Sequence, residues 1–218
     1  MAGIAGNGES ALRDLKGKIA WITGAGTGIG QAGAVSLARA GMEVVLSGRR
    51  RENLEETAAL VEKTGKVPVI EELDVADSES VSEVVARIEE RFQRLDVAVL
   101  SAGINVKNRS WKEVDTDGWD SVVDIDLNGA FYCCRSVLPI MRRQKEGLIV
   151  NVASWAGVRV SKLTGPAYTA AKHGMVAMSE SLNMEEAING IRSCALCPGE
   201  VATPILENRP VKVTDEEK

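Results

Sequence analysis

The feature that most constrains this fold is a regular alternation of short apolar runs with longer amphipathic stretches after Gly17. Runs of this length are typical of buried strands, and their alternation with helical patterns is typical of βαβ units. In one stretch Asp77 can cap a helix whose apolar residues Val81, Val84, Val85, Ile88 and Phe92 recur at helical spacing. The six runs are Ile19–Thr23, Val44–Ser47, Val67–Leu73, Val97–Ser101, Leu148–Ala153 and Cys194–Cys197. We therefore predict an α/β fold with a doubly wound parallel β-sheet flanked by helices.

The chain has no break in composition that would divide it into two domains. Its 218 residues, 44% of them apolar, fit one domain with a sizeable core, and no internal repeat or low-complexity linker is present. We predict a flexible leader over residues 1–16 and a single domain over residues 17–218. The segment Thr214-Asp215-Glu216-Glu217 matches a capping box, which predicts that the C-terminal end is truncated inside a helix.

Charge and cysteine content exclude several classes of protein. The net charge of -5, without a basic block, argues against a nucleic-acid partner. A polar, Gly-rich start and the lack of a long apolar run argue against a signal peptide and a membrane span. The four cysteines lack the dense spacing of a disulfide framework, which favours a reducing compartment. We expect a cytoplasmic protein with no nucleic-acid or membrane partner.

A glycine-rich loop, Thr23-Gly24-Ala25-Gly26-Thr27-Gly28-Ile29-Gly30, separates the first predicted strand from an amphipathic segment over residues 31–40. In a dinucleotide loop, Gly24 would allow the tight turn, Gly28 the approach of a pyrophosphate, and Gly30 close packing of helix on strand. The helix N-terminus would offer N–H groups to the anion. A structural turn is the alternative, because such a motif alone is a weak signal. The strand and helix on either side favour a dinucleotide site in a Rossmann-type fold.

The residues after the second predicted strand bear on the choice of cofactor. An acidic side chain there would bind the ribose 2′-OH of NAD, but the strand runs into Ser47-Gly48-Arg49-Arg50-Arg51. Guanidinium groups pair well with the 2′-phosphate of NADP. The alternative, that the arginines only balance Glu52, Glu55 and Glu56 on a solvated helix, is favoured for Arg51 and is open for Arg50. We predict NADP(H) in preference to NAD(H), with Arg49 as the main contact.

A tyrosine and a lysine stand four residues apart in Tyr168-Thr169-Ala170-Ala171-Lys172, and thus on one face if this stretch is helical. A tyrosine, with its ordinary pKa of about 10, is a poor base at neutral pH, but a neighbouring ammonium favours its phenolate. Alone, a pair at this spacing is explained better by a solvated helix face. The surrounding motifs decide between the two interpretations.

The ordered motifs resemble those of the classical short-chain dehydrogenases/reductases. The resemblance runs from about Lys18 to about Pro204 and is highly specific, because it consists of several motifs in order. They are Thr23 to Gly30, Leu73-Asp74-Val75, Ser101-Ala102-Gly103, Ser154 ahead of Tyr168 and Lys172, and Pro198-Gly199-Glu200-Val201-Ala202-Thr203-Pro204.

The resemblance implies a role for each matching residue. Tyr168 would be the general acid/base, Lys172 would lower its pKa and hold the nicotinamide ribose, and Ser154 would bind the substrate oxygen. Asp74 would bind the adenine amino group, and residues 198–203 would run alongside the nicotinamide amide. The expected cofactor-binding residues are Gly24, Thr27, Gly28, Ile29, Gly30, Arg49, Asp74, Val75, Ser101, Ala102, Gly103, Tyr168, Lys172, Pro198, Gly199, Val201 and Thr203.

The chain departs from the family pattern at two places. Ser101-Ala102-Gly103 stands where the family usually has Asn-Ala-Gly, which we expect to have a modest effect on the fold. Asp126 aligns with the family's catalytic asparagine, two residues before Asn128. In the family this position holds a proton-relay water largely through its backbone carbonyl, which an aspartate also presents. We therefore count Asp126 among the catalytic residues and expect activity to survive.

Other reactive residues do not form a site of their own. Cys194 and Cys197, three apart in a predicted strand, point to opposite faces, and Cys133-Cys134 are predicted core residues of an apolar helix. His173 is the only histidine, so a Ser-His-acid hydrolase is hard to build. We predict no metal site.

The sequence therefore predicts an NADP-dependent oxidoreductase that transfers a hydride between the nicotinamide and a carbonyl or secondary alcohol. By analogy with the family it would be a homodimer or homotetramer. A 3-oxoacyl thioester, a sugar or polyol and a steroid all remain open as substrates. The alternative from another class is a non-catalytic nicotinamide-binding redox sensor or regulatory subunit, which Asp126 favours and the intact Ser154, Tyr168 and Lys172 set opposes.

Overall fold

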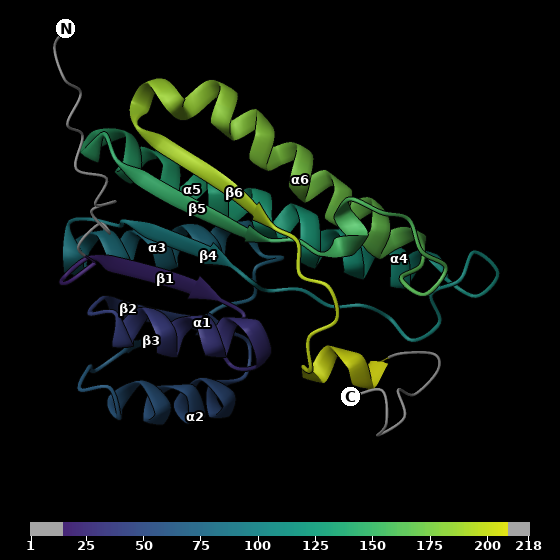
Figure 1. The fold of residues 1–218 in the computed structure, drawn as a ribbon, viewed down its shortest axis with the longest axis horizontal. Coiled ribbons are helices and arrows are strands. Elements are labelled where there is room, and N and C mark those ends of the chain that lie inside the picture. Colours follow the sequence, from purple (N-terminus) through teal and green to yellow (C-terminus); the bar gives the residue numbers. More distant parts are fainter. Residues whose placement is uncertain (1–14, 209–218) are drawn as a thin grey trace, which may run out of the picture.

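The computed structural model describes residues 15–208. They form a six-stranded parallel sheet of strand order β3-β2-β1-β4-β5-β6 with helices on both faces (Figure 1). The prediction of a single-domain, Rossmann-type fold is confirmed. Most of the predicted leader, residues 1–16, and the capping box at residues 214–217 lie outside the described residues.

Each of the six predicted apolar runs lies on a strand. The bounds agree to within one residue for the first, second, fourth and fifth, and they differ by more for the third and sixth. The strands are β1 Ile19–Thr23, β2 Glu43–Gly48, β3 Val69–Glu72, β4 Val97–Leu100, β5 Gly147–Val152 and β6 Ile191–Leu196. The third begins two residues later than predicted, because Pro68 has no N–H to donate to the ladder. The sixth begins three residues earlier and ends before Cys197, because Arg192 and Ser193 belong to an edge strand of the described sheet with alternating exposure.

The helices cover the two faces of the sheet in separate groups. They are α1 Gly28–Arg39, α2 Arg51–Glu62, α3 Ser78–Phe92, α4 Thr116–Val123, α5 Gly129–Gln144 and α6 Pro166–Glu186, with 3-10 turns at Trp155–Gly157, Ala187–Asn189 and Pro204–Asn208 and a π-helical turn at Asp124–Asn128. Alternate β1 residues face opposite sides, so Trp21 joins the core under α3 and α5 while Ile22 joins the core under α1 and α2. None of the helices in residues 15–208 is both long and apolar enough to cross a membrane.

The predicted helix after the third strand is confirmed as α3. The Asp77 side chain accepts hydrogen bonds from the N–H groups of Glu79 and Ser80, at 3.0 and 3.3 Å, and so caps the helix. Val81, Val84, Val85 and Ile88 are buried against the sheet, and Phe92 packs at the edge of the same core.

The order of the strands fixes where a ligand can bind. The chain builds β1, β2 and β3 outward in one direction and then returns to place β4 on the other side of β1. The two connections that leave β1 and β4 therefore diverge at the carboxyl ends of these strands and leave a crevice between them. Thr23 lies beside Leu100 at this end of the sheet.

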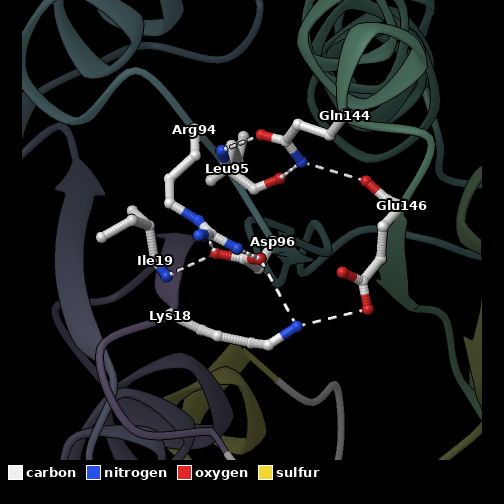
Figure 2. A network of polar contacts seen from close by, with 7 residues as sticks. All are labelled: Lys18, Ile19, Arg94, Leu95, Asp96, Gln144 and Glu146. Carbon is white, nitrogen blue, oxygen red and sulfur yellow. Dashed lines mark hydrogen bonds and ion pairs between the residues drawn. The ribbon is translucent and has the colours of Figure 1, made fainter.

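The opposite end of the sheet is held by a network of charged and amide groups (Figure 2). The Asp96 carboxylate, next to the start of β4, accepts two hydrogen bonds from Arg94, at 2.6 and 2.9 Å, and one from the N–H of Ile19, at 2.8 Å. Gln144 at the end of α5 exchanges hydrogen bonds with the backbone of Leu95. The network thus fixes the amino ends of β1 and β4 to the end of α5.

Replacement of Asp96 by asparagine is expected to destabilise the fold by about 2 kcal/mol, because it removes the charge from a buried acceptor of three hydrogen bonds. Burial alone would raise the pKa of the Asp96 carboxyl, but Arg94, the Ile19 N–H and Lys18 together lower it. A lowered pKa stabilises the fold above the unfolded-state value of about 3.9, and this contribution is lost as the pH falls through the folded-state value.

Urea unfolding of the wild type and Asp96→Asn at neutral and acidic pH measures this difference, with the exposed Asp120→Asn as control. A difference that did not shrink below about pH 4 would contradict this assignment.

Candidate functional site

The crevice at the carboxyl ends of β1 and β4 is a cleft of about 550 Å³. At one end lie the glycine loop and the arginines after β2, and at the other lie Ser154, Tyr168 and Lys172. The predicted residues that line it are Gly24, Thr27, Gly28, Ile29, Arg49, Asp74, Val75, Ser101, Ala102, Gly103, Ser154, Tyr168, Lys172, Pro198, Gly199, Val201 and Thr203. Gly30 and Asp126 are the two predicted site residues that lie behind the wall of the cleft rather than in it.

Two glycines of the loop lie where a side chain would crowd a neighbouring segment, Gly24 against the residues after β4 and Gly28 against Thr203. Gly24 and Gly28 have φ of 63° and 57°, a region that favours glycine. A Cβ on Gly24 would lie 2.7 Å from the Ala102 nitrogen, and one on Gly28 would lie 3.1 Å from Cγ2 of Thr203. Thr27 precedes α1 without a side-chain capping bond, so the first-turn N–H groups are left for another acceptor. The loop thus fits a pyrophosphate that approaches the backbone closely.

Gly30 contributes from behind the loop. A Cβ on this residue would lie 2.3 Å from the carbonyl oxygen of Gly24 and 3.2 Å from Cα of Ala25. The first turn of α1 therefore packs directly on the turn that follows β1. The sequence predicts that Gly30 allows close packing of the helix on the strand. The structure shows close packing at Gly30, but against the loop rather than the strand.

Two of the three arginines after β2 face the cleft. Arg49 and Arg50 are exposed side chains at its edge. Arg51 instead begins α2 and pairs with Glu55 and Glu72, both at 2.9 Å. The prediction that Arg51 balances helix glutamates is confirmed for Glu55, and Glu72 on the neighbouring β3 is a further partner. Arg49 and Arg50 are the guanidinium groups placed to meet an anion in the cleft.

Tyr168 and Lys172 lie on one face of α6, as their spacing predicts. The helix begins with Pro166 after Gly165, whose φ is 73°. The Lys172 ammonium lies 5.4 Å from the centre of the Tyr168 ring, within the range of a cation–π contact. Lys172 is only 3% exposed, and its Nζ donates to the Val152 carbonyl at 3.1 Å. The helix and β5 thus hold a cation against the tyrosine ring.

Ser154 follows β5 on the same side of the cleft. Its Oγ accepts a hydrogen bond from the N–H of Ala156 at 3.1 Å, which fixes the side chain at the start of a 3-10 turn. Because that bond uses a lone pair of the oxygen, the hydroxyl hydrogen is left to donate elsewhere. The backbone here also receives the C-terminal segment, since the Trp155 N–H donates to the Pro198 carbonyl at 2.8 Å.

Asp126 lies on the π-helical turn between α4 and α5 and is fully buried. Its Oδ1 accepts a 2.7 Å hydrogen bond from the N–H of Ile104, directly after Ser101-Ala102-Gly103. Its Oδ2 is 3.3 Å from the Lys172 Nζ, which makes an ion pair by distance without the angles of a hydrogen bond. Burial raises the pKa of the Asp126 carboxyl, and Lys172 and the Ile104 N–H oppose that rise only in part.

Several residues of the cleft were not foreseen from the sequence. Asn53, Asn105 and Arg109 also line it. Asn105 donates to the Thr164 carbonyl at 3.0 Å and accepts from the Val106 N–H at 2.8 Å, so it ties the loop after β4 to the loop before α6. Asn105 could have been predicted as a cleft residue, because it comes just after the Ser101-Ala102-Gly103 motif. Arg109 is buried in a loop without periodic pattern, and no local sequence signal marks it.

None of the four cysteines lines the cleft, and neither does His173. Cys133 and Cys134 are buried in α5, as predicted, and burial raises the pKa of the Cys134 thiol to about 12. His173 Nδ1 is 2.9 Å from the carbonyl of Thr169 on its own helix. Within residues 15–208, no group of three or more His, Cys, Asp or Glu side chains is arranged to hold a metal ion.

A sequence model for the family described as short chain dehydrogenase matches residues 18–213. This chain belongs to the short-chain dehydrogenase family. It is 36% identical over 190 residues to a 3beta-hydroxysteroid dehydrogenase of Mediterraneibacter gnavus, covering 87% of this chain and 68% of that protein. Membership makes it an NAD(P)-dependent oxidoreductase that acts on CH–OH groups, and the glycine cradle and open α1 N-terminus described above fit such a dinucleotide.

Solved structures agree with this membership. The chain superposes on levodione reductase with a TM-score of 0.86 and 36% identity, covering 88% of this chain and 75% of that one. A putative short-chain alcohol dehydrogenase from Sinorhizobium meliloti 1021 gives a TM-score of 0.83 and 38% identity, covering 87% and 75%. The TM-scores show that this short-chain dehydrogenase shares its overall fold with both structures.

Replacement of Gly30 by alanine is expected to weaken NADPH binding at least about tenfold and to destabilise the fold by about 2 kcal/mol, because the new methyl would displace the backbone of Gly24. Gly33→Ala in the same helix is the matched control. Nothing lies within 4 Å of its added methyl, so it should leave binding unchanged and raise stability by about 1 kcal/mol. Fluorescence titration with NADPH and urea unfolding measure both effects. Equal NADPH affinity in the two variants would show that the loop does not hold the cofactor.

Proposed function

We propose that this short-chain dehydrogenase uses NADP(H) to interconvert a ketone and a secondary alcohol, with Tyr168 as general acid/base. The observation that carries the proposal is the joint position of Tyr168, Lys172 and Ser154 on the wall of one cleft whose other end is formed by the glycine loop and Arg49. A hydride donor and a proton donor must reach the two atoms of one carbonyl, and a single cleft with these two ends meets that need.

Ser154, Tyr168 and Lys172 have separate roles in the proposed reaction. Ser154, whose Oγ already accepts from the Ala156 N–H, donates its hydroxyl hydrogen to the substrate oxygen and so orients it. In reduction Tyr168 gives its proton to that oxygen, and in oxidation the phenolate takes the proton back. The Lys172 ammonium beside the ring favours the phenolate. The nicotinamide, when bound, supplies or accepts the hydride at the carbon.

The names of the relatives support a ketone or secondary alcohol as the substrate class. One is a dehydrogenase named for a hydroxysteroid, and the other is a reductase named for a dione. These are the alcohol side and the ketone side of the same reaction. Among the substrates open from the sequence, ring ketones and their alcohols are therefore the first to test, before sugars, polyols and 3-oxoacyl thioesters.

Arg49 is the residue on which the choice of NADP(H) rests. Replacement of Arg49 by alanine should weaken NADPH binding about tenfold or more and leave NADH binding within about twofold, because only NADPH carries the 2′-phosphate. Arg51→Ala is the control, since Arg51 is held by Glu55 and Glu72. Fluorescence titrations with both nucleotides measure the change. Wild-type protein that bound NADH more tightly than NADPH would refute the preference.

Replacement of Tyr168 by phenylalanine should lower turnover about a thousandfold, because the variant has no proton to exchange with the substrate oxygen. NADPH affinity should change little. The sequence has only two tyrosines, so Tyr132→Phe on α5 is the matched control and should retain full activity. NADPH oxidation against ketones, sugars and acyl thioesters measures turnover. A wild type that bound NADPH but showed no Tyr168-dependent turnover would instead be a nicotinamide sensor.

A further inference from the structure

A fully buried carboxylate faces the active-site lysine from behind the cleft. Asp126 is 0% exposed, Lys172 is 3% exposed, and Oδ2 and Nζ are 3.3 Å apart. Asp126 comes from the π-helical turn Asp124–Asn128, whereas Lys172 comes from α6. A carboxyl group and an ammonium group from separate elements therefore meet at the wall of the cleft, with Lys172 in its lining and Asp126 behind it.

Backbone groups hold both charges in place. Oδ1 of Asp126 accepts from the Ile104 N–H at 2.7 Å, and Lys172 Nζ donates to the Val152 carbonyl at 3.1 Å. A Cβ on Gly103 would lie 3.2 Å from Lys172 Nζ and 3.3 Å from Asp126 Oδ2. The pair is thus packed closely against the backbone of Gly103, and a side chain at this position would push against both groups.

We propose that Asp126 is a positioning residue that acts through Lys172: its carboxylate holds the ammonium behind Gly103 and reduces the positive charge that favours the Tyr168 phenolate. The proposal rests on the proposed function, in which Tyr168 exchanges the proton. The family resemblance implies an asparagine at this position, so the proposal concerns a charge that the resemblance does not imply.

The physical reason is the difference between a carboxylate and an amide at this distance. An asparagine can also accept the Ile104 N–H, but it has no negative charge to offer the ammonium. A buried ammonium with a carboxylate beside it exerts a weaker field on its surroundings than the ammonium alone. Asp126 and Lys172 together therefore give less support to the phenolate than Lys172 would give with an asparagine beside it.

The charge of Asp126 in turn depends on the groups that face it. On α6 the charged group is Lys172, with Tyr168 beyond it on the same face, and the loop after β4 offers the Ile104 N–H. On its own turn Asp124 is exposed and accepts a hydrogen bond from Asn128 at 2.8 Å. In the described part of the chain, Lys172 is thus the charged partner of this carboxylate.

The test compares the pH dependence of alcohol oxidation in the wild type and Asp126→Asn. The acid limb of kcat/KM should lie about one pH unit lower in Asp126→Asn, because the unopposed ammonium favours the phenolate. A purely structural role would lower the rate equally at every pH and leave the limb in place. Asp124→Asn makes the same chemical change on the same turn, without contact with Lys172, and should keep the wild-type profile. Limbs that superimpose, or a shift to higher pH, would overturn the proposal.

A second measurement needs no turnover. Because burial raises the pKa of Asp126, the folded protein holds this proton more tightly than the unfolded chain. The cofactor-free wild type should therefore lose stability as the pH rises from about 4 through the folded-state pKa, and Asp126→Asn should lack this loss. Identical pH dependence of thermal unfolding would refute a titrating carboxylate beside Lys172. If no substrate is turned over, the proposed function fails, and this stability comparison alone decides the pairing.

Discussion

The close approach of the turn after β1 to the end of β4 is the constraint on which the site depends. Two hydrogen bonds to Thr23 Oγ1, from the N–H groups of Ser101 and Ala102, tie the two strand ends together at 3.2 and 3.3 Å. Gly24 has no space for a side chain against Ala102. The strand order sends the connections that leave these two strand ends apart, and the cleft opens between them.

The two ends of the sheet have different roles, one in the stability of the fold and the other in the candidate site. At the amino ends, Asp96 and Arg94 form a charged network that is far from the cleft and serves the fold (Figure 2). At the carboxyl ends, a buried lysine lies beside a tyrosine and a carboxylate, an arrangement that costs free energy to bury unless the charges are paired. The stability that the network provides at the amino ends of the strands allows the carboxyl ends to hold such a site.

Local patterns in the sequence were sufficient for the fold and for most of the cleft. Apolar runs predicted the six strands, and glycine spacing together with the Tyr168 and Lys172 spacing placed both ends of the site. The start of β3 was predicted two residues too early, because the apolar run includes Pro68, which cannot donate to the ladder. Asp126 was predicted as a site residue from the family resemblance, but its burial against Lys172 was not predicted, because a π-helical turn leaves no sequence pattern and sets the direction of the side chain. The contacts of Asp96 with Ile19 and Lys18 likewise could not be predicted, since these two residues lie far from it in the sequence.

In the proposed function, one cleft holds the nicotinamide cofactor at the glycine loop and brings its reactive end to Tyr168. A crystal structure of the protein with NADPH bound tests this most directly. The account predicts the pyrophosphate over the loop from Gly24 to Gly30, the 2′-phosphate at Arg49 and the nicotinamide ribose beside Lys172 and Tyr168. A cofactor bound with its nicotinamide away from Tyr168, or outside this cleft, would contradict it.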